Sequence, residues 1–89
     1  MKIIFSDDAE LGIERIGDWI ARDDPLRAAS FSTELRDVCE ALRGFPKRFP
    51  RVGAESDLHK RTYGNYLILY QAVTIIAIEH ASRDLTSLL

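Results

Sequence analysis

The sequence is poor in the residues that build metal centres and disulfides. It has one cysteine, Cys39, and two histidines, His59 and His80, among 89 residues. A single cysteine excludes an internal disulfide, which fits a reducing compartment such as the cytoplasm. With so few thiolate and imidazole ligands a dedicated zinc site is not expected, so we predict neither a metal nor any other cofactor.

Long hydrophobic runs are missing as well. The longest apolar stretch, residues 66–78, is interrupted by Gln71 and Thr74 and is too short to cross a bilayer. The N-terminal residues 1–5 run directly into Ser6-Asp7-Asp8, without the apolar core and cleavage site of a secretory signal. We therefore expect a cytoplasmic protein without a membrane partner, folded as a single domain over residues 1–89.

The charge is nearly balanced overall but unevenly distributed. Residues 1–24 hold three basic and seven acidic side chains, a balance of −4, whereas residues 43–61 hold six basic and two acidic ones, a balance of +4. We define the basic patch as Lys47, Arg48, Arg51 and Lys60. A protein that binds RNA through phosphates is usually basic overall, so this bipolar chain suits a charged protein partner at least as well. Two merely solvated faces are an equally good explanation.

The first half of the chain predicts a short strand followed by a helical hairpin. Lys2 to Phe5 is β-like, and Ser6 or Asp7 can cap a helix that extends to about Ile20. Asp24 followed by Pro25 is a typical start for a second helix. Its apolar stripe is formed by Ala28, Phe31, Leu35, Val38, Leu42 and Phe45, and Gly44 with Pro46 ends it. So short a connection makes the helices antiparallel. Trp19 and Cys39 are predicted to be packing residues rather than reactive ones.

The second half predicts an antiparallel meander. Residues 58–62 form one strand, Tyr63-Gly64-Asn65 the turn, residues 66–72 the next strand and residues 75–79 its partner. The two later strands are apolar on both faces, so each face needs a cover. The helical hairpin supplies one cover, and we expect the chain's own tail or a partner to supply the other. The fold class is therefore α+β, with an N-terminal strand, an antiparallel helical hairpin, a three-stranded meander and a short C-terminal turn or helix.

Two C-terminal motifs carry a resemblance to a known family. Residues 64–70 read Gly-Asn-Tyr-Leu-Ile-Leu-Tyr, and residues 80–84 read His-Ala-Ser-Arg-Asp. Together with the helix pattern of residues 9–31 and the segment 42–46, they resemble the RelE/ParE superfamily of bacterial toxin–antitoxin modules, in particular its ParE, or plasmid-stabilisation, branch. The similarity covers nearly the whole chain. It implies a growth-arresting toxin of RelE/ParE-like fold, with a cognate antitoxin, ParD-like or of another family, as its partner.

The superfamily has two modes of action. ParE-type toxins poison DNA gyrase by binding it, without catalytic residues of their own, whereas RelE-type toxins cleave mRNA in the ribosomal A site. RelE-type toxins carry an arginine on the second strand of the hairpin, where this chain has Leu67. A leucine cannot stabilise an oxyanion, so the resemblance favours a gyrase inhibitor that is not an enzyme. A ribosome-dependent endoribonuclease and an inactive antitoxin-binding module remain as alternatives.

The site residues follow from this interpretation. The target-binding residues are predicted to be Arg61, His80, Arg83 and Asp84, and the antitoxin-binding residues Trp19, Tyr66 and Tyr70, with no catalytic residues. Tyr66 and Tyr70 are equally compatible with a place in the core. The ribonuclease alternative requires Lys60, Arg61, Tyr63, His80 and Arg83 to gather at one end of the sheet. The family's antitoxins are expected to be DNA-binding dimers, so any link to DNA is indirect.

Overall fold

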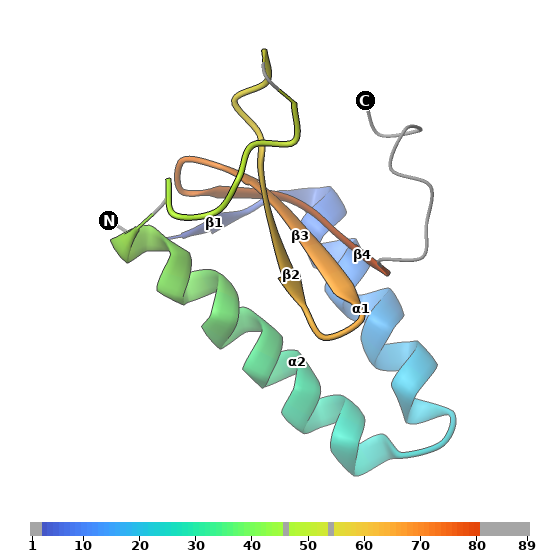
Figure 1. The fold of residues 1–89 in the computed structure, drawn as a ribbon. Coiled ribbons are helices and arrows are strands. Elements are labelled where there is room, and N and C mark those ends of the chain that lie inside the picture. The colour runs from blue at the N-terminus through green and yellow to red at the C-terminus, as the bar shows by residue number, and fades with distance from the viewer. Residues whose placement is uncertain (1–2, 46, 54, 81–89) are drawn as a thin grey trace.

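The computed structural model describes residues 3–45, 47–53 and 55–80. The elements are β1 (Ile4–Phe5), α1 (Asp7–Ala21), α2 (Pro25–Ala41), the 3-10 turn η1 (Leu42–Gly44), β2 (His59–Tyr63), β3 (Tyr66–Gln71) and β4 (Thr74–His80). The two helices form an antiparallel hairpin beside the sheet (Figure 1). This confirms the α+β fold class with its strand, helical hairpin and meander. The expected C-terminal turn or helix lies outside the described residues.

The helices begin where their capping residues predict. The Ser6 hydroxyl accepts a hydrogen bond of 3.0 Å from the Ala9 N–H and donates one of 2.7 Å to the Ile76 carbonyl. The same side chain therefore starts α1 and ties its first turn to β4. The Asp24 carboxylate accepts from the Arg27 N–H at 3.0 Å and starts α2, with Pro25 in the first turn.

The sheet has four strands in the order β1-β4-β3-β2. β1 pairs in parallel with the start of β4, and β2, β3 and β4 pair antiparallel. The predicted strand boundaries shift by about one residue, and the hairpin turn is reduced to Gly64 and Asn65, with Gly64 at a φ of 59°. Ala72, which we expected at the end of β3, lies in the following turn at a φ of 52°. The strand order leaves β2 at one edge of the sheet.

The core lies between the helical hairpin and one face of the sheet. Its largest fully buried side chains are Tyr70, Leu35, Ile68, Ile75 and Cys39. Cys39 is thus the packing residue that we predicted, whereas Trp19 is 65% exposed and Phe45 is 69% exposed. Phe45 leaves the stripe because α2 ends at Ala41 and the chain turns through η1 before reaching it. The prediction that Trp19 is a packing residue is therefore wrong.

The opposite face of β3 is also covered. Leu67 and Leu69, which alternate with Ile68 and Tyr70 along the strand, are only 4% and 5% exposed. The chain itself buries these two side chains. This face therefore does not require a partner, and an argument for a partner has to come from other surfaces.

Candidate functional site

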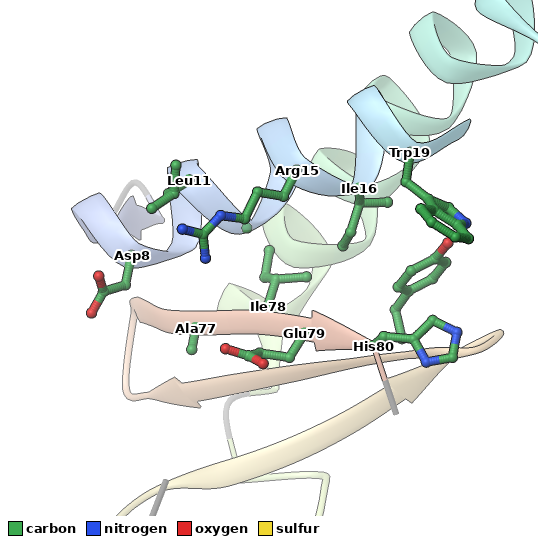
Figure 2. Close-up of a pocket in the computed structure, with 11 residues that line it drawn as sticks. Asp8, Leu11, Arg15, Ile16, Trp19, Ala77, Ile78, Glu79 and His80 are labelled. Carbon is green, nitrogen blue, oxygen red and sulfur yellow. The ribbon is translucent and has the colours of Figure 1, made fainter. Parts of the chain in front are cut away.

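A groove runs between α1 and the end of β4 (Figure 2). It has a volume of about 560 Å³. Its walls are formed by α1 residues Asp8, Leu11, Gly12, Arg15, Ile16 and Trp19, by Tyr66 of β3 and by β4 residues Ala77, Ile78, Glu79 and His80. We call it the α1–β4 groove. Its floor is apolar: it is formed by the side chains of Ile16 and Ile78, which are only 8% and 3% exposed.

Gly12 sets how closely the two walls of this groove approach each other. A Cβ atom at this position would lie closer than 3.0 Å to the carbonyl oxygen of Ile78. The missing side chain therefore lets the backbone of α1 lie directly against β4. This close approach explains a glycine in the middle of a helix, where it otherwise costs about 1 kcal/mol relative to alanine.

Aromatic side chains gather at one end of the α1–β4 groove. The rings of Tyr66 and His80 meet edge to face, with centroids 5.4 Å apart. The Tyr66 ring also packs against the Phe31 ring, with centroids 5.2 Å apart. Trp19 lies at the same end of the groove as His80 (Figure 2). An exposed tryptophan beside an apolar floor is typical of the energetic centre of a protein interface.

A second surface is formed where the segment after η1 meets β2. The Arg61 guanidinium lies over the Phe49 ring at 4.8 Å and over the Tyr63 ring at 5.7 Å, and its Nη1 donates to the Thr62 carbonyl at 3.0 Å. Arg48 lies over the Phe49 ring at 5.8 Å. We call Arg48, Phe49, Arg61 and Tyr63 the Arg61 shelf. Cation–π contacts of this kind hold a guanidinium in place without neutralising its charge.

The segment that carries Phe49 is tied to the edge of the sheet. The His59 Nδ1 lies 2.7 Å from the Phe49 carbonyl oxygen, and the Lys60 N–H donates to the Pro50 carbonyl at 2.9 Å. The backbones of Arg51 and His59 also pair in an isolated antiparallel β-bridge. These bonds hold the segment that carries Phe49 against β2, which brings Phe49 next to Arg61.

The basic patch has no acidic counterpart in the described part of the chain. Among the described residues, two salt bridges join Arg27 to Glu34 and Arg36 to Glu10, and neither involves the basic patch. The cations without such a bridge to a described carboxylate include Lys47, Arg48, Arg51, Lys60 and Arg61. The positive charge that the sequence showed is therefore not cancelled locally.

Tyr63 is held by the second helix. Its hydroxyl donates to the Glu34 carboxylate, which also accepts from Arg27 at 2.9 Å. The hydrogen bond to Tyr63, followed by that to Arg27, lowers the pKa of Glu34, and the same bond raises the pKa of Tyr63. The phenol of Tyr63 thus serves to join β2 to α2 and holds its proton more tightly than a free tyrosine.

The residues required by the ribonuclease alternative are only partly brought together. Tyr63 pairs with Tyr66 and Tyr66 with His80, so Tyr63 and His80 share one end of the sheet with Tyr66 between them. Two strand spacings separate them by roughly 10 Å. Lys60 alternates to the face opposite Arg61. Arg83 lies outside the described residues, as does Asp84, so their predicted role in target binding stays a prediction.

Tyr70 and Cys39 are both removed from the surface. Tyr70 is fully buried and stacks on His59 at 5.4 Å, and burial raises the pKa of its phenol. Burial also raises the pKa of the Cys39 thiol to about 12. Tyr70 does not line the α1–β4 groove, in contrast to Trp19 and Tyr66.

The described residues include no cluster of His, Cys, Asp or Glu that could hold a metal ion. No helix among them is long and apolar enough to cross a membrane.

Three residues of these surfaces, Leu11, Arg15 and Phe49, were not predicted from the sequence. Leu11, Arg15 and Trp19 follow one another at intervals of four along α1, and this second stripe could have indicated a groove. Phe49 stands in the run Lys47-Arg48-Phe49-Pro50-Arg51, and an aromatic residue among cations is a signal for cation–π contacts.

Fold and surfaces together define a small α+β protein with two surfaces suited to binding. The groove supplies an apolar floor with exposed aromatic rings, and the shelf supplies fixed positive charge. The chain belongs to the family described as ParE toxin of type II toxin-antitoxin system, parDE, whose model matches residues 3–85. It is therefore a toxin of a type II toxin–antitoxin system, and this family implies a cognate antitoxin as partner. No curated protein matches the sequence.

Proposed function

We propose that this toxin stops growth by binding DNA gyrase, without catalysis, and that its antitoxin neutralises it by docking in the α1–β4 groove. The antitoxin is ParD-like or of another family and links the toxin to DNA only indirectly. The observation that carries the docking proposal is the exposure of Trp19, 65%, at a groove whose floor is apolar. Family membership, matched over residues 3–85, supports the gyrase target.

The shape of the groove suits a segment that folds as it binds. Leu11 and Trp19 on α1 are 40% and 65% exposed along the groove, and Tyr66 and His80 line the same groove. An amphipathic segment that lays apolar side chains on this surface would remove these rings from water. Disordered segments bind in this way because they order only on the partner's surface. The antitoxin-binding residues that we propose are therefore Trp19 and Tyr66, and fully buried Tyr70 is left out.

The arrangement of acids and bases supports binding rather than cleavage. Phosphodiester cleavage needs a base, an acid and cations around the developing phosphorane. The Tyr63 hydroxyl is engaged with Glu34, and its pKa is raised by that bond. Leu67, at the position of the RelE-type arginine, is 4% exposed and cannot contact a substrate. We therefore propose a toxin that is not an enzyme and acts in the cytoplasm through Arg61, His80, Arg83 and Asp84.

The target is tested with purified gyrase. Toxin added to a supercoiling reaction is expected to stop supercoiling and to leave gyrase-dependent breaks in the DNA. Primer extension on ribosome-bound mRNA is the parallel assay. Cuts in the ribosomal A site without an effect on gyrase would instead show a ribonuclease. Activity in neither assay, with antitoxin binding retained, would show an inactive module.

The working edge is tested by Arg83→Ala. We expect this variant to lose toxicity while it still binds antitoxin, because the substitution removes a cation that we assign to target binding and changes none of the described residues that line the α1–β4 groove. Growth after induction and antitoxin pull-down are the two measurements. Arg22→Ala, which removes a cation from the end of α1, is the matched control and should remain toxic. Full toxicity of Arg83→Ala would show that the assigned edge is wrong.

A further inference from the structure

We propose that the Arg61 shelf is a second binding surface, and that it accepts an acidic peptide segment of a protein partner whose carboxylates pair with the Arg61 guanidinium. The proposal names a ligand class for Arg61, which the proposed function assigns to target binding, and it concerns a surface distinct from the α1–β4 groove. It depends only on the charge and geometry of the described residues along the edge of β2, and it can hold or fail whatever the target of the toxin is.

Arg61 is positioned before any partner binds. Phe49 and Tyr63 contribute ring contacts at 4.8 and 5.7 Å, and the bond of 3.0 Å from Nη1 to the Thr62 carbonyl fixes the guanidinium further. A guanidinium has five N–H donors, so most of them remain for a ligand. Planar donors in this arrangement match the two oxygens of a carboxylate. Because the side chain is already held, little of its conformational freedom is lost on binding.

The positive charge around Arg61 favours binding of an anion from outside the described chain. Arg27 and Arg36, the two arginines of α2, each pair with a carboxylate at 2.9 Å or less. Neither Arg61 nor the basic patch has a salt bridge to a described carboxylate, although Glu55 and Asp57 lie in the same stretch of the sequence. A group of cations left without local partners raises the concentration of anionic segments near the surface.

The aromatic rings of the shelf argue for a peptide rather than a nucleic acid. Single-stranded nucleic acids bind by stacking bases on free aromatic faces. Phe49 already carries the guanidinium groups of both Arg48 and Arg61, and Tyr63 carries Arg61 as well. The whole chain has a net charge of −2, which opposes a long phosphate backbone. A short acidic segment avoids both obstacles.

The edge of β2 adds a backbone donor for such a segment. The Lys60 N–H points away from β3, since it donates to the Pro50 carbonyl. Thr62 lies two residues further along the same edge strand, so its N–H points in the same direction. Thr62 is also exposed. An extended peptide that lies along this edge can accept a hydrogen bond there while its carboxylates reach Arg61.

The test uses a short fluorescein-labelled peptide of alternating Glu and Ser, titrated with the full chain and followed by fluorescence anisotropy. We expect binding that weakens with salt, and Arg61→Gln to weaken it about tenfold, the effect of losing a charge-assisted hydrogen bond. Arg22→Gln is the matched control, because Arg22 also lies over a ring, that of Trp19 at 5.3 Å, and its loss changes the charge equally. That variant should stay within about twofold of the parent.

A further variant and probe make the outcome decisive. Arg61→Lys keeps the charge and the fold but loses the planar donors, so it should bind less tightly than the parent and more tightly than Arg61→Gln. An equal effect of Arg61→Gln and Arg22→Gln, or no binding of the acidic peptide, would overturn the proposal. Tighter binding of an oligouridylate of the same length would overturn it in favour of a nucleic-acid surface. Gyrase and antitoxin take no part in these measurements, so their outcome is separate from that of the proposed function.

Discussion

At the scale of single residues, the two glycines of α1 have the same low helix propensity but different surroundings in the fold. Gly12 faces the Ile78 carbonyl, where a Cβ would come closer than 3.0 Å, whereas a Cβ at Gly17 would meet only the Ser32 hydroxyl at 3.3 Å. We predict that Gly12→Ala lowers the free energy of unfolding by about 2 kcal/mol through overpacking. Gly17→Ala, the matched control, should change it by less than about 1 kcal/mol and can raise it. Urea unfolding measures both, and similar values for the two variants would contradict the close approach.

The same residues show what the sequence could not reveal. In the sequence both glycines look alike, as weak points of a predicted helix. The difference arises from the tertiary contact between residues 12 and 78, which no local pattern encodes. Cys39, by contrast, was predicted correctly as a packing residue, because the sequence near it lacks the bases that activate a thiol.

At the scale of the elements, Glu10 and Arg36 join the two helices through two hydrogen bonds of 3.0 and 2.6 Å. The hydrogen bond from Arg36 lowers the pKa of Glu10 from its usual 4.5. A lowered folded-state pKa gives stability above the unfolded pKa, and that stability is lost as the pH falls through the folded pKa. Both side chains are more than 40% exposed, so we expect a contribution of only about 0.5 kcal/mol.

Substitution at Glu10 tests this contribution. Glu10→Gln should be less stable than the parent at about pH 6, and the difference should shrink towards about pH 3, because lowering the pH protonates Glu10 in the parent. The free energy of unfolding is measured by urea titration at each pH. Glu14→Gln, one turn further along the same helix and without a hydrogen bond to Arg36 among the described residues, controls for the general effect of removing an acid from α1. A difference that is the same at both pH values would show that Arg36 is not responsible.

At the same scale, local sequence signals predicted the helices and strands well. They predicted contacts between residues far apart in the chain less well. Ser6, Asp24 and Gly64 determine two helix starts and one turn within a few residues, so the sequence shows them directly. The irregular register between Leu69 and Tyr70 and the Glu10–Arg36 bridge depend on distant residues. The α1–β4 groove was missed for the same reason, since it arises where α1 meets a strand that begins more than 50 residues after the helix ends.

At the scale of the whole molecule, the two proposed surfaces lie at different strands of the sheet. The strand order β1-β4-β3-β2 places β4, with the α1–β4 groove, on one side of β3 and β2, with the Arg61 shelf, on the other. The acidic stretch of residues 1–24 includes α1, whereas the basic patch lies beside β2. The charge segregation of the sequence is thus also a segregation in space. One partner can occupy the apolar groove while an acidic segment occupies the shelf.

The groove itself is tested by Trp19→Ala. The side chain is 65% exposed and is not part of the core, so the variant should fold and still arrest growth. We expect its affinity for the antitoxin to fall at least tenfold, about the loss for a tryptophan at the centre of an interface. Isothermal titration measures that affinity, and co-expression shows whether the antitoxin still rescues growth. Leu26→Ala is the matched control, because Leu26 is an apolar side chain of 86% exposure at the start of α2 that does not line the groove. If Leu26→Ala weakens the antitoxin as much as Trp19→Ala, or if neither variant changes its binding, the antitoxin docks elsewhere on the molecule.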